Sequence, residues 1–309
     1  MINRDVHVNV CVVTCRQPDE LAVLLRSLVR QRVMPALSYT VIVVDNDAQG
    51  SAREVTAAFA VHSEIPVRYC VEPERNISMA RNRALEKSAG DYVAFIDAHA
   101  IPQPEWLQNL VDMAQAFEAD AVFGPVLQKF PQGTPEWIIH GGFFERPRYL
   151  NAVRVRGGSA ANVLIRRASV QRFGTPFNPA LGDAGGEGSE FFHRLYRSGA
   201  RYLWCDTAVV HESISVDKFK LRYLAEHAFL SGQASACVTL AGYGVLQKIR
   251  WVVGRASTLA AALLGAAISW PMGRSIGVWS VQQVCSSLGQ LSVLADQRFK
   301  AMPENHAAH

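Results

Sequence analysis

The chain has 309 residues, enough for one large domain or two modest ones with a substantial core. Hydrophobic residues make up 49% and charged residues 19%, as in an ordinary folded protein. The net charge of +4 is small and dispersed, and no basic run carries interleaved aromatics, which argues against a nucleic-acid partner.

Cysteine usage and the N-terminal residues favour a cytoplasmic protein. The six cysteines are scattered, mostly within apolar runs, and none forms a Cys-x-x-Cys pair. We therefore expect buried, reduced thiols. A strand is predicted from about Val8 without a preceding basic region and long apolar run, so no signal peptide is expected.

Strands and helices alternate through residues 8–99. Apolar, β-branched runs predict strands at 8–14, 39–44, 67–71 and 91–97. Apolar residues at helical spacing predict helices between them, at 18–29, 54–59 and 76–88. Alternation of this kind indicates a doubly wound, parallel sheet.

Polar side chains follow three of these strands. They are Thr14 and Arg16, then Asp45, Asn46 and Asp47, and finally Asp97 and His99. The carboxyl ends of parallel strands share one edge, so these clusters predict a nucleotide-sized cleft. Asp97 and His99 lie on one side of an extended chain, where a carboxylate and an imidazole can ligate a divalent metal that holds a diphosphate. The alternative is a solvated polar loop.

Other catalytic signatures are absent from the sequence. No Gly-x-Gly-x-x-Gly or lysine-bearing glycine loop follows the first strand, which disfavours dinucleotide enzymes and nucleotidyltransferases. The nucleophile elbow Gly-x-Ser-x-Gly is also missing. His211-Glu212 lacks the second histidine of a zinc-protease motif.

The middle of the chain is less regular. A helix is expected at 104–118, with strands at 121–125 and 163–165. Residues 130–151 are rich in Pro, Gly and aromatics, and they form either a substrate-facing loop or a small aromatic core. The small residues at 157–162 allow close approach of a ligand, or simply a tight packing turn.

A glycine-rich acidic segment at 182–190 precedes a helix predicted at 191–198. We expect a mobile loop that orders on a ligand. Its Glu187 and Glu190 are candidates for a general base or for binding an acceptor hydroxyl, although Glu190 alternatively serves the helix dipole. The next predicted strand, 202–210, ends at His211, a second histidine directly after a strand.

From about Phe219 the chain is expected to be helical, and it is most apolar at 256–270. That stretch is shorter than the ~20 residues of a spanning helix, and Pro271 ends it. The helices are flanked by Lys218, Lys220, Arg222, Lys248, Arg250 and Arg255. They suit a protein resting on an anionic inner leaflet, or a helical cap packed on the domain or on a second subunit.

Five segments, taken in order, carry a family resemblance. They are Val-Val-Thr-Cys-Arg at 12–16, Val-Ile-Val-Val-Asp-Asn-Asp at 41–47, Asn-Ile-Ser-Met-Ala-Arg-Asn at 76–82, Gly-Asp-Tyr-Val-Ala-Phe-Ile-Asp at 90–97 and Gly-Gly-Glu-x-x-Glu-Phe-Phe at 185–192. This set resembles the family-2 glycosyltransferases, most of all the bacterial exopolysaccharide glucosyltransferases of the succinoglycan type. The resemblance covers about residues 8–235.

The resemblance implies an α/β fold of the A-type glycosyltransferases, a Rossmann-like, mostly parallel sheet flanked by helices, with a C-terminal helical, membrane-associated segment. It also implies a UDP-sugar donor and a Mn²⁺ or Mg²⁺ ion. The donor-binding residues that it implies are Thr14, Arg16, Asp45, Asn46, Arg81, Asn82 and Asp97. Asp97 matches the first carboxylate of the family's Asp-x-Asp motif, where a metal neutralises the leaving diphosphate.

The chain departs from the family pattern at two places. Asp97-Ala98-His99 replaces the usual Asp-Asp-Asp and resembles the Asp-x-His metal motif of the polypeptide N-acetylgalactosaminyltransferases, which add a later histidine ligand. His211 stands where that ligand would fall, so Asp97, His99 and His211 are the implied metal ligands. Glu187-Gly188 replaces the usual Glu-Asp, which leaves Glu187 or Glu190 as the base, or no base at all.

The implied organisation is a glycosyltransferase domain at 1–235, with a nucleotide-sugar-binding half (1–100) and an acceptor half (101–235), then a helical segment at 236–300 and a disordered tail at 301–309. The implied function is inverting transfer of a hexose, glucose from UDP-glucose, to a lipid-linked oligosaccharide in exopolysaccharide biosynthesis. Such a protein would work at the cytoplasmic face of the cell membrane, alone or as a homo-oligomer. The alternative is a catalytically silent relative that binds nucleotide sugar or scaffolds a polysaccharide assembly complex.

Overall fold

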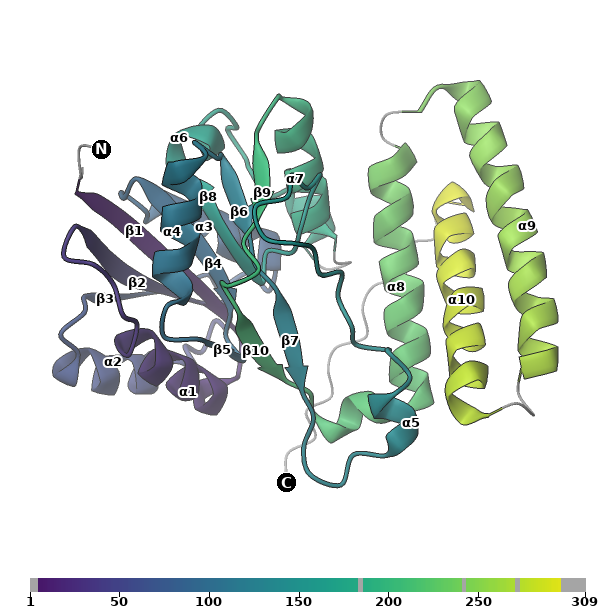
Figure 1. Cartoon of the computed structure of the whole chain (residues 1–309), viewed down its shortest axis with the longest axis horizontal. Helices are drawn as coiled ribbons and strands as arrows, with labels where there is room; N and C mark the ends of the chain where they lie inside the picture. Colours follow the sequence, from purple (N-terminus) through teal and green to yellow (C-terminus); the bar gives the residue numbers. More distant parts are fainter. Residues whose placement is uncertain (1–4, 183–185, 241–242, 270–272, 296–309) are drawn as a thin grey trace. The chain divides into compact units, whose positions relative to one another are not determined.

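The computed structural model describes residues 5–182, 186–240, 243–269 and 273–295. The chain divides into two compact units (Figure 1). The first comprises Met1–Phe130, Phe144–Pro179 and Glu187–Ile214, and the second comprises Pro131–Phe143, Ala180–Gly186 and Ser215–His309. The domain boundary predicted after residue 235 falls inside helix α8 (Leu221–Leu240), and the predicted tail at 301–309 lies outside the described residues.

The N-terminal part of the first unit follows the predicted alternation of strands and helices. Its elements are β1 (Val6–Thr14), α1 (Pro18–Val29), β2 (Leu37–Asp45), α2 (Arg53–His62), β3 (Val67–Val71), α3 (Ile77–Glu86) and β4 (Tyr92–Asp97). β1 pairs in parallel with β2 and β4, and β2 pairs in parallel with β3. The prediction of a parallel, doubly wound sheet is confirmed here.

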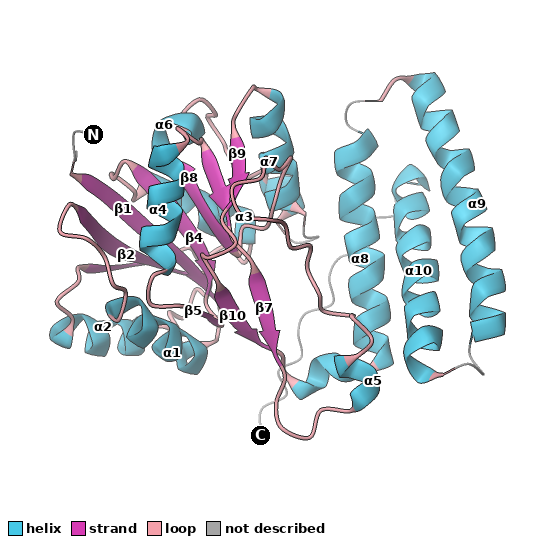
Figure 2. Ribbon diagram, in the orientation of Figure 1, coloured by secondary structure: helices cyan, strands magenta, loops and turns pink. Residues whose placement is uncertain are grey.

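The remainder of the first unit completes two sheets (Figure 2). Its elements are β5 (Ala100–Pro102), α4 (Trp106–Ala116), β6 (Ala121–Phe123), β7 (Val126–Lys129), β8 (Asn162–Arg166), α6 (Arg167–Val170), α7 (Glu187–Arg197), β9 (Tyr202–Trp204) and β10 (Val210–Ser213). The seven-stranded sheet has the order β3-β2-β1-β4-β8-β6-β9, with β8 antiparallel to its neighbours, and a three-stranded sheet has the order β5-β10-β7. The single strand predicted at 202–210 is therefore wrong, because β9 and β10 belong to different sheets.

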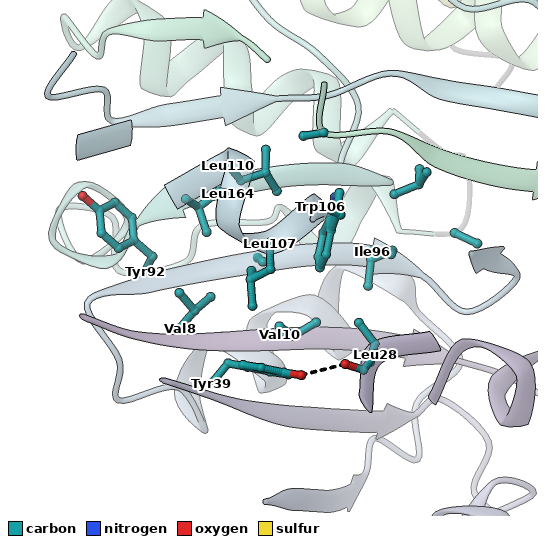
Figure 3. Packing of buried hydrophobic residues seen from close by; sticks show 14 of the residues in the cluster. Val8, Val10, Leu28, Tyr39, Tyr92, Ile96, Trp106, Leu107, Leu110 and Leu164 are labelled. Carbon is teal, nitrogen blue, oxygen red and sulfur yellow. Dashed lines mark hydrogen bonds between the residues drawn. The ribbon is translucent and has the colours of Figure 1, made fainter. Parts of the chain in front are cut away.

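Helices cover both faces of the larger sheet because its strands are apolar on both sides. Val10 and Val12 of β1 belong to a core with residues of α1 and α4, while Cys11 belongs to a second core with residues of α3 and α7. Figure 3 shows the first core, in which the Tyr39 hydroxyl donates to the backbone oxygen of Leu28 at 2.6 Å. Each large buried side chain stabilises this arrangement by about 1.5–3 kcal/mol.

The second unit is mainly helical. It contains α5 (Glu136–Ile139), α8, α9 (Val245–Ser269) and α10 (Arg274–Ser292), together with the short 3-10 helices η2 (Val216–Phe219) and η4 (Val293–Ala295), while η1 (Pro179–Leu181) begins at the end of the first unit. α10 packs against both α8 and α9. Glycines allow the close approach of α8 and α10, since a Cβ on Gly289 would lie 2.0 Å from the backbone oxygen of Phe229. Among the described residues, no helix is both long enough and apolar enough to cross a membrane.

Candidate active site

The carboxyl ends of three strands meet at one edge of the larger sheet. Thr14 at the end of β1 pairs with Asp45 at the end of β2, and Val13 pairs with Asp97 at the end of β4. β1 lies between β2 and β4. The prediction that the polar clusters share one edge is confirmed, and such an edge is where ligands bind in open α/β sheets.

Asp45 organises the loop that borders this edge. Its carboxylate accepts hydrogen bonds from the backbone N–H of Ala52 at 2.7 Å and from the hydroxyls of Tyr69 at 2.9 Å and Ser51 at 3.3 Å. Burial, together with the bond to Asp45, raises the pKa of Tyr69 to about 12. Asp45 is 0% exposed, so this carboxylate is engaged by the fold, and its donor-binding role stays a prediction.

Asn46 and Asn82 are also used by the fold. The Asn46 side-chain amide donates to the backbone oxygens of Glu72 at 3.0 Å and Glu74 at 2.5 Å, which fixes the chain after β3. Asn82 donates to the backbone oxygen of Phe177 at 2.7 Å and accepts from its N–H at 2.9 Å. Both side-chain amides thus hydrogen-bond to backbone groups of loops that regular secondary structure leaves unpaired. These contacts do not match the donor-binding role predicted for the two residues.

Thr14 and Arg16 remain suited to a ligand. The Thr14 hydroxyl oxygen is buried and has no hydrogen-bond partner among the described residues, so it can bond to an incoming group. Arg16 has a left-handed backbone with φ of 54°, a conformation that costs energy in a non-glycine residue. Its side chain is 61% exposed and lies 3.5 Å from a carboxylate oxygen of Asp47.

Arg81 of α3 lies between two carboxylates. One guanidinium nitrogen donates to Glu187, and another lies 4.0 Å from an oxygen of Asp97. Burial lowers the pKa of Arg81 from its ordinary value, while the charge of Asp97 opposes that shift. An arginine remains protonated through such shifts, so a fixed positive charge stands beside the carboxylate that ends β4.

The two predicted bases lie in the first turn of a helix. α7 begins at Glu187, whereas the sequence predicts a loop up to residue 190, and residues 183–185 lie outside the described part of the chain. Glu187 is buried against Arg81. Glu190 makes two bonds to Arg194, at 2.5 Å and 3.0 Å. Both carboxylates are therefore ion-paired.

His99 is held by a buried glutamate that the sequence analysis missed. Nε2 of His99 lies 3.0 Å from Oε1 of Glu212 on β10. The second oxygen of Glu212 accepts from the Arg146 guanidinium at 2.8 Å. Glu212 pairs with Ala100 of β5 in the smaller sheet, where β5 and β10 lie side by side (Figure 1).

His211 does not join Asp97 and His99 in this structure. Successive residues of a strand point to opposite faces, so His211 faces away from the side of β10 on which Glu212 meets His99. Nδ1 of His211 is buried without a hydrogen-bond partner. Burial and, secondly, the charge of Lys129 lower the pKa of His211. The Nε2 contact of His99 is thus with Glu212 and not with His211, and a metal-binding role for His211 stays a prediction.

Asp97 and His99 fit a metal that is shared with a ligand. Within the described ranges, no three His, Cys, Asp or Glu side chains are grouped as a protein-only metal site. Asp97 is 30% exposed, with its nearest cation 4.0 Å away, so its oxygens are accessible. A carboxylate with an imidazole is a suitable donor pair for Mn²⁺. Ions of this kind commonly take their other ligands from substrate phosphates.

The sequence indicates only partly that Glu212 and Arg146 belong to the candidate site. His211-Glu212 directly follows a predicted strand, and either side chain of such a pair can face the site, depending on the register. His211 was the predicted ligand because an imidazole binds divalent metals well. Arg146 lies within an irregular stretch, where no periodicity indicates the direction of a side chain.

The family comparison covers more than half of the chain. Residues 9–174 match the family model described as Glycosyl transferase family 2. Succinoglycan biosynthesis protein ExoM of Rhizobium meliloti (strain 1021) is 35% identical over 233 residues, which are 75% of this chain and 75% of ExoM.

Solved structures share the fold at low identity. The mannosyltransferase PcManGT from Pyrobaculum calidifontis, in complex with GDP-Man and Mn²⁺, is similar with a TM-score of 0.65 and 18% identity over 94% of this chain and 87% of its own. S. aureus TarS 1-349, in complex with UDP-GlcNAc, is similar with a TM-score of 0.54 and 15% identity over 94% and 92% of the two chains. The predicted A-type fold is confirmed.

Proposed function

We propose that this chain, which belongs to glycosyl transferase family 2, transfers glucose from UDP-glucose to a lipid-linked oligosaccharide in exopolysaccharide biosynthesis. The likeness to a succinoglycan biosynthesis protein supports the pathway class. The observation that carries the proposal is the pair at the carboxyl end of β4, where the partly exposed carboxylate of Asp97 lies 4.0 Å from the buried guanidinium of Arg81.

The chemistry of this edge suits departure of a nucleoside diphosphate. A divalent metal held by Asp97 and His99 would neutralise charge on the leaving diphosphate. Arg81 is buried and fixed by Glu187, so it adds positive charge without having to reorganise. The hydroxyl of Thr14 and the exposed guanidinium of Arg16 supply donor groups for the nucleotide at the end of β1.

Glu187 is the proposed base for an inverting transfer. It begins α7 and lies against Arg81, which in turn lies 4.0 Å from Asp97. To act, it has to exchange Arg81 for the acceptor hydroxyl, because a carboxylate bound to an arginine is a weak base. Glu190 lies in the same turn but is bound on both oxygens by Arg194, which makes it the matched control.

The proposals of a lipid-linked acceptor and of a location at the membrane rest on the surface of the second unit. Leu246, Ile249 and Val253 of α9 are exposed, Leu246 by 78%. Lys248, Arg250, Arg255 and Arg274 are the charged residues between Glu226 and Asp296, so this stretch is purely basic. An exposed apolar stripe with basic neighbours suits the anionic inner leaflet, where a lipid-linked acceptor would lie.

Vesicle binding tests this location. The protein should sediment with vesicles containing anionic lipid and stay in solution with neutral ones, and Lys248→Glu with Arg250→Glu should abolish sedimentation. Dimerisation in solution that buries Leu246 and Ile249, without sedimentation, would instead assign the stripe to a second copy of the chain.

A catalytically silent relative is the second candidate. The supporting observation is that both predicted bases, Glu187 and Glu190, are ion-paired, and that Gly188 stands where the family usually has aspartate. Such a protein would bind nucleotide sugar without turnover.

Product analysis separates the two candidates. The protein is incubated with Mn²⁺, a panel of UDP-sugars and lipid-linked acceptors, and the product is examined by nuclear magnetic resonance. A β-linked glucose product that is lost in Glu187→Gln and kept in Glu190→Gln is the expected result. Saturable UDP-glucose binding with no product from any acceptor would favour the silent relative.

A further inference from the structure

Glu212 is a buried carboxylate with a different cation or proton donor on each oxygen. Oε1 lies 3.0 Å from Nε2 of His99, and Oε2 accepts from Arg146 at 2.8 Å. Its side chain is only 8% exposed. Burying a carboxylate is costly unless it is paired and hydrogen-bonded, and the contacts with His99 and Arg146 help to offset this cost.

The contact with Glu212 decides which nitrogen of His99 faces a ligand. An ionised carboxylate only accepts hydrogen bonds, so Nε2 of His99 carries the proton in this contact. In the neutral imidazole the lone pair is then on Nδ1. Arg146 supplies the opposite charge to Glu212, and a metal binds histidine in its neutral form.

We infer that Glu212 is a positioning residue, which fixes His99 in the tautomer that presents Nδ1 to the divalent metal of the donor complex. This inference rests on the proposed function. A carboxylate behind a ligating histidine orients the ring and raises its basicity, and loss of such a partner typically weakens metal affinity by about 10–100-fold. Neither Glu212 nor Arg146 belongs to the motifs by which the chain resembles its family.

Arg146 also links Glu212 to the segment that contains Ser159. Its guanidinium also donates to the Ser159 hydroxyl at 3.3 Å, and that hydroxyl accepts from the N–H of Ala161 at 3.2 Å. From the sequence, the region around Arg146 is expected to be either a substrate-facing loop or a small aromatic core, and the small residues near Ser159 to allow either close approach of a ligand or a tight packing turn. Order in these segments is thereby coupled to Glu212 and, through it, to His99.

The first test measures Mn²⁺ affinity in the presence of UDP by electron paramagnetic resonance. Glu212→Gln should weaken it by about 10–100-fold, because an amide offers one acceptor and places an N–H₂ group against His99 or Arg146. Arg146→Ala, at a partly exposed position, should weaken it by a smaller factor. Arg148→Ala is the matched control, since Arg148 lies in the same segment but pairs with Asp206.

A double variant tests whether Glu212 acts through His99. In a His99→Ala background, Glu212→Gln should cause no further loss of Mn²⁺ affinity, because residues acting in one interaction are not additive. Independent, additive losses would overturn the inference, and so would wild-type affinity in both Glu212→Gln and Arg146→Ala.

The tautomer of His99 gives a readout that requires neither metal nor sugar transfer. In ¹⁵N-histidine spectra of the metal-free protein, His99 should show a proton on Nε2, and Glu212→Gln should shift it toward a mixture of tautomers. A proton on Nδ1 in the wild type would overturn the inference. Sugar transfer that persists at full rate in EDTA would also overturn it, while leaving the proposed function standing.

Discussion

Asp45 and Asp97 end the strands on either side of β1, yet their surroundings differ in kind. Asp45 is fully buried and accepts three hydrogen bonds from its own loop and from Tyr69. Asp97 is 30% exposed, and its nearest cation is Arg81 at 4.0 Å. The same topological position is therefore filled by a carboxylate with three hydrogen bonds in one strand and by a partly exposed carboxylate in the other, and we expect only the second to take part in the proposed chemistry.

The largest effect is expected at Asp97. Asp97→Asn removes a negative ligand from the predicted metal site, so sugar transfer with Mn²⁺ should fall by about 100-fold or more. The free energy of unfolding should change by less than about 0.5 kcal/mol, because the carboxylate is partly exposed. UDP release and urea denaturation measure the two quantities. Wild-type UDP release in this variant would remove Asp97 from the chemistry.

The opposite pattern is expected at Asp45. Asp45→Asn places an amide N–H₂ group among three donors, which should lower the free energy of unfolding by about 1–3 kcal/mol. Activity per folded molecule should fall far less than in Asp97→Asn. If the variant unfolds at the wild-type urea concentration but loses UDP binding, Asp45 contacts the donor after all.

Asn82 and Arg81, which are neighbours on α3, should show the same contrast between an effect on stability and an effect on activity, with smaller magnitudes. Asn82→Ala removes both hydrogen bonds to the backbone of Phe177, so stability should fall by about 1–2 kcal/mol. Arg81→Lys loses the planar group between Glu187 and Asp97, so it should lower the rate of transfer more than it lowers stability. Thermal denaturation and UDP release, measured on both variants, check this contrast.

The smallest effect concerns Tyr69 at alkaline pH. Its pKa is raised to about 12, so the folded protein holds this proton more tightly than the unfolded chain does. The resulting stability is present below the unfolded pKa of about 10 and is lost as the pH rises toward 12. Tyr69→Phe should therefore lose about 0.5 kcal/mol at pH 8 and lose stability less steeply than the wild type above pH 10. Urea midpoints from pH 8 to 11 provide the measurement, and parallel curves would contradict the assignment.

The fold was predictable wherever local pattern decides it. β1 to β4 are apolar on both faces, and the helices between them repeat at helical spacing, so their order and the shared edge followed from sequence. The strand β8 was predicted at 163–165, but its antiparallel direction and the sheet β5-β10-β7 were not predictable, because the partners of these strands lie far away along the chain. These pairings depend on packing that no local window contains.

The sequence was enough to predict which strand ends form the candidate site, but not which side chains contact one another there. Sequence reasoning placed Asp97 at this edge correctly, since Asp97 ends a strong strand, whereas His99 lies in the turn that follows and contacts Glu212 of the smaller sheet. It could not tell that Asn46 and Asn82 bind backbone, because an amide suits a loop as well as it suits a ligand. It also chose His211 over Glu212, since a shift of one residue along a strand reverses which of the two faces the site.

The most direct test of which strand end carries the chemistry is a crystal structure with UDP and Mn²⁺, with the metal located by anomalous scattering. We expect an anomalous peak for a metal that contacts Asp97, Nδ1 of His99 and the diphosphate, while Asp45 keeps its hydrogen bonds to Ala52 and Tyr69. A peak beside Asp45 or Asp47, or UDP bound at this edge without any metal peak, would contradict it.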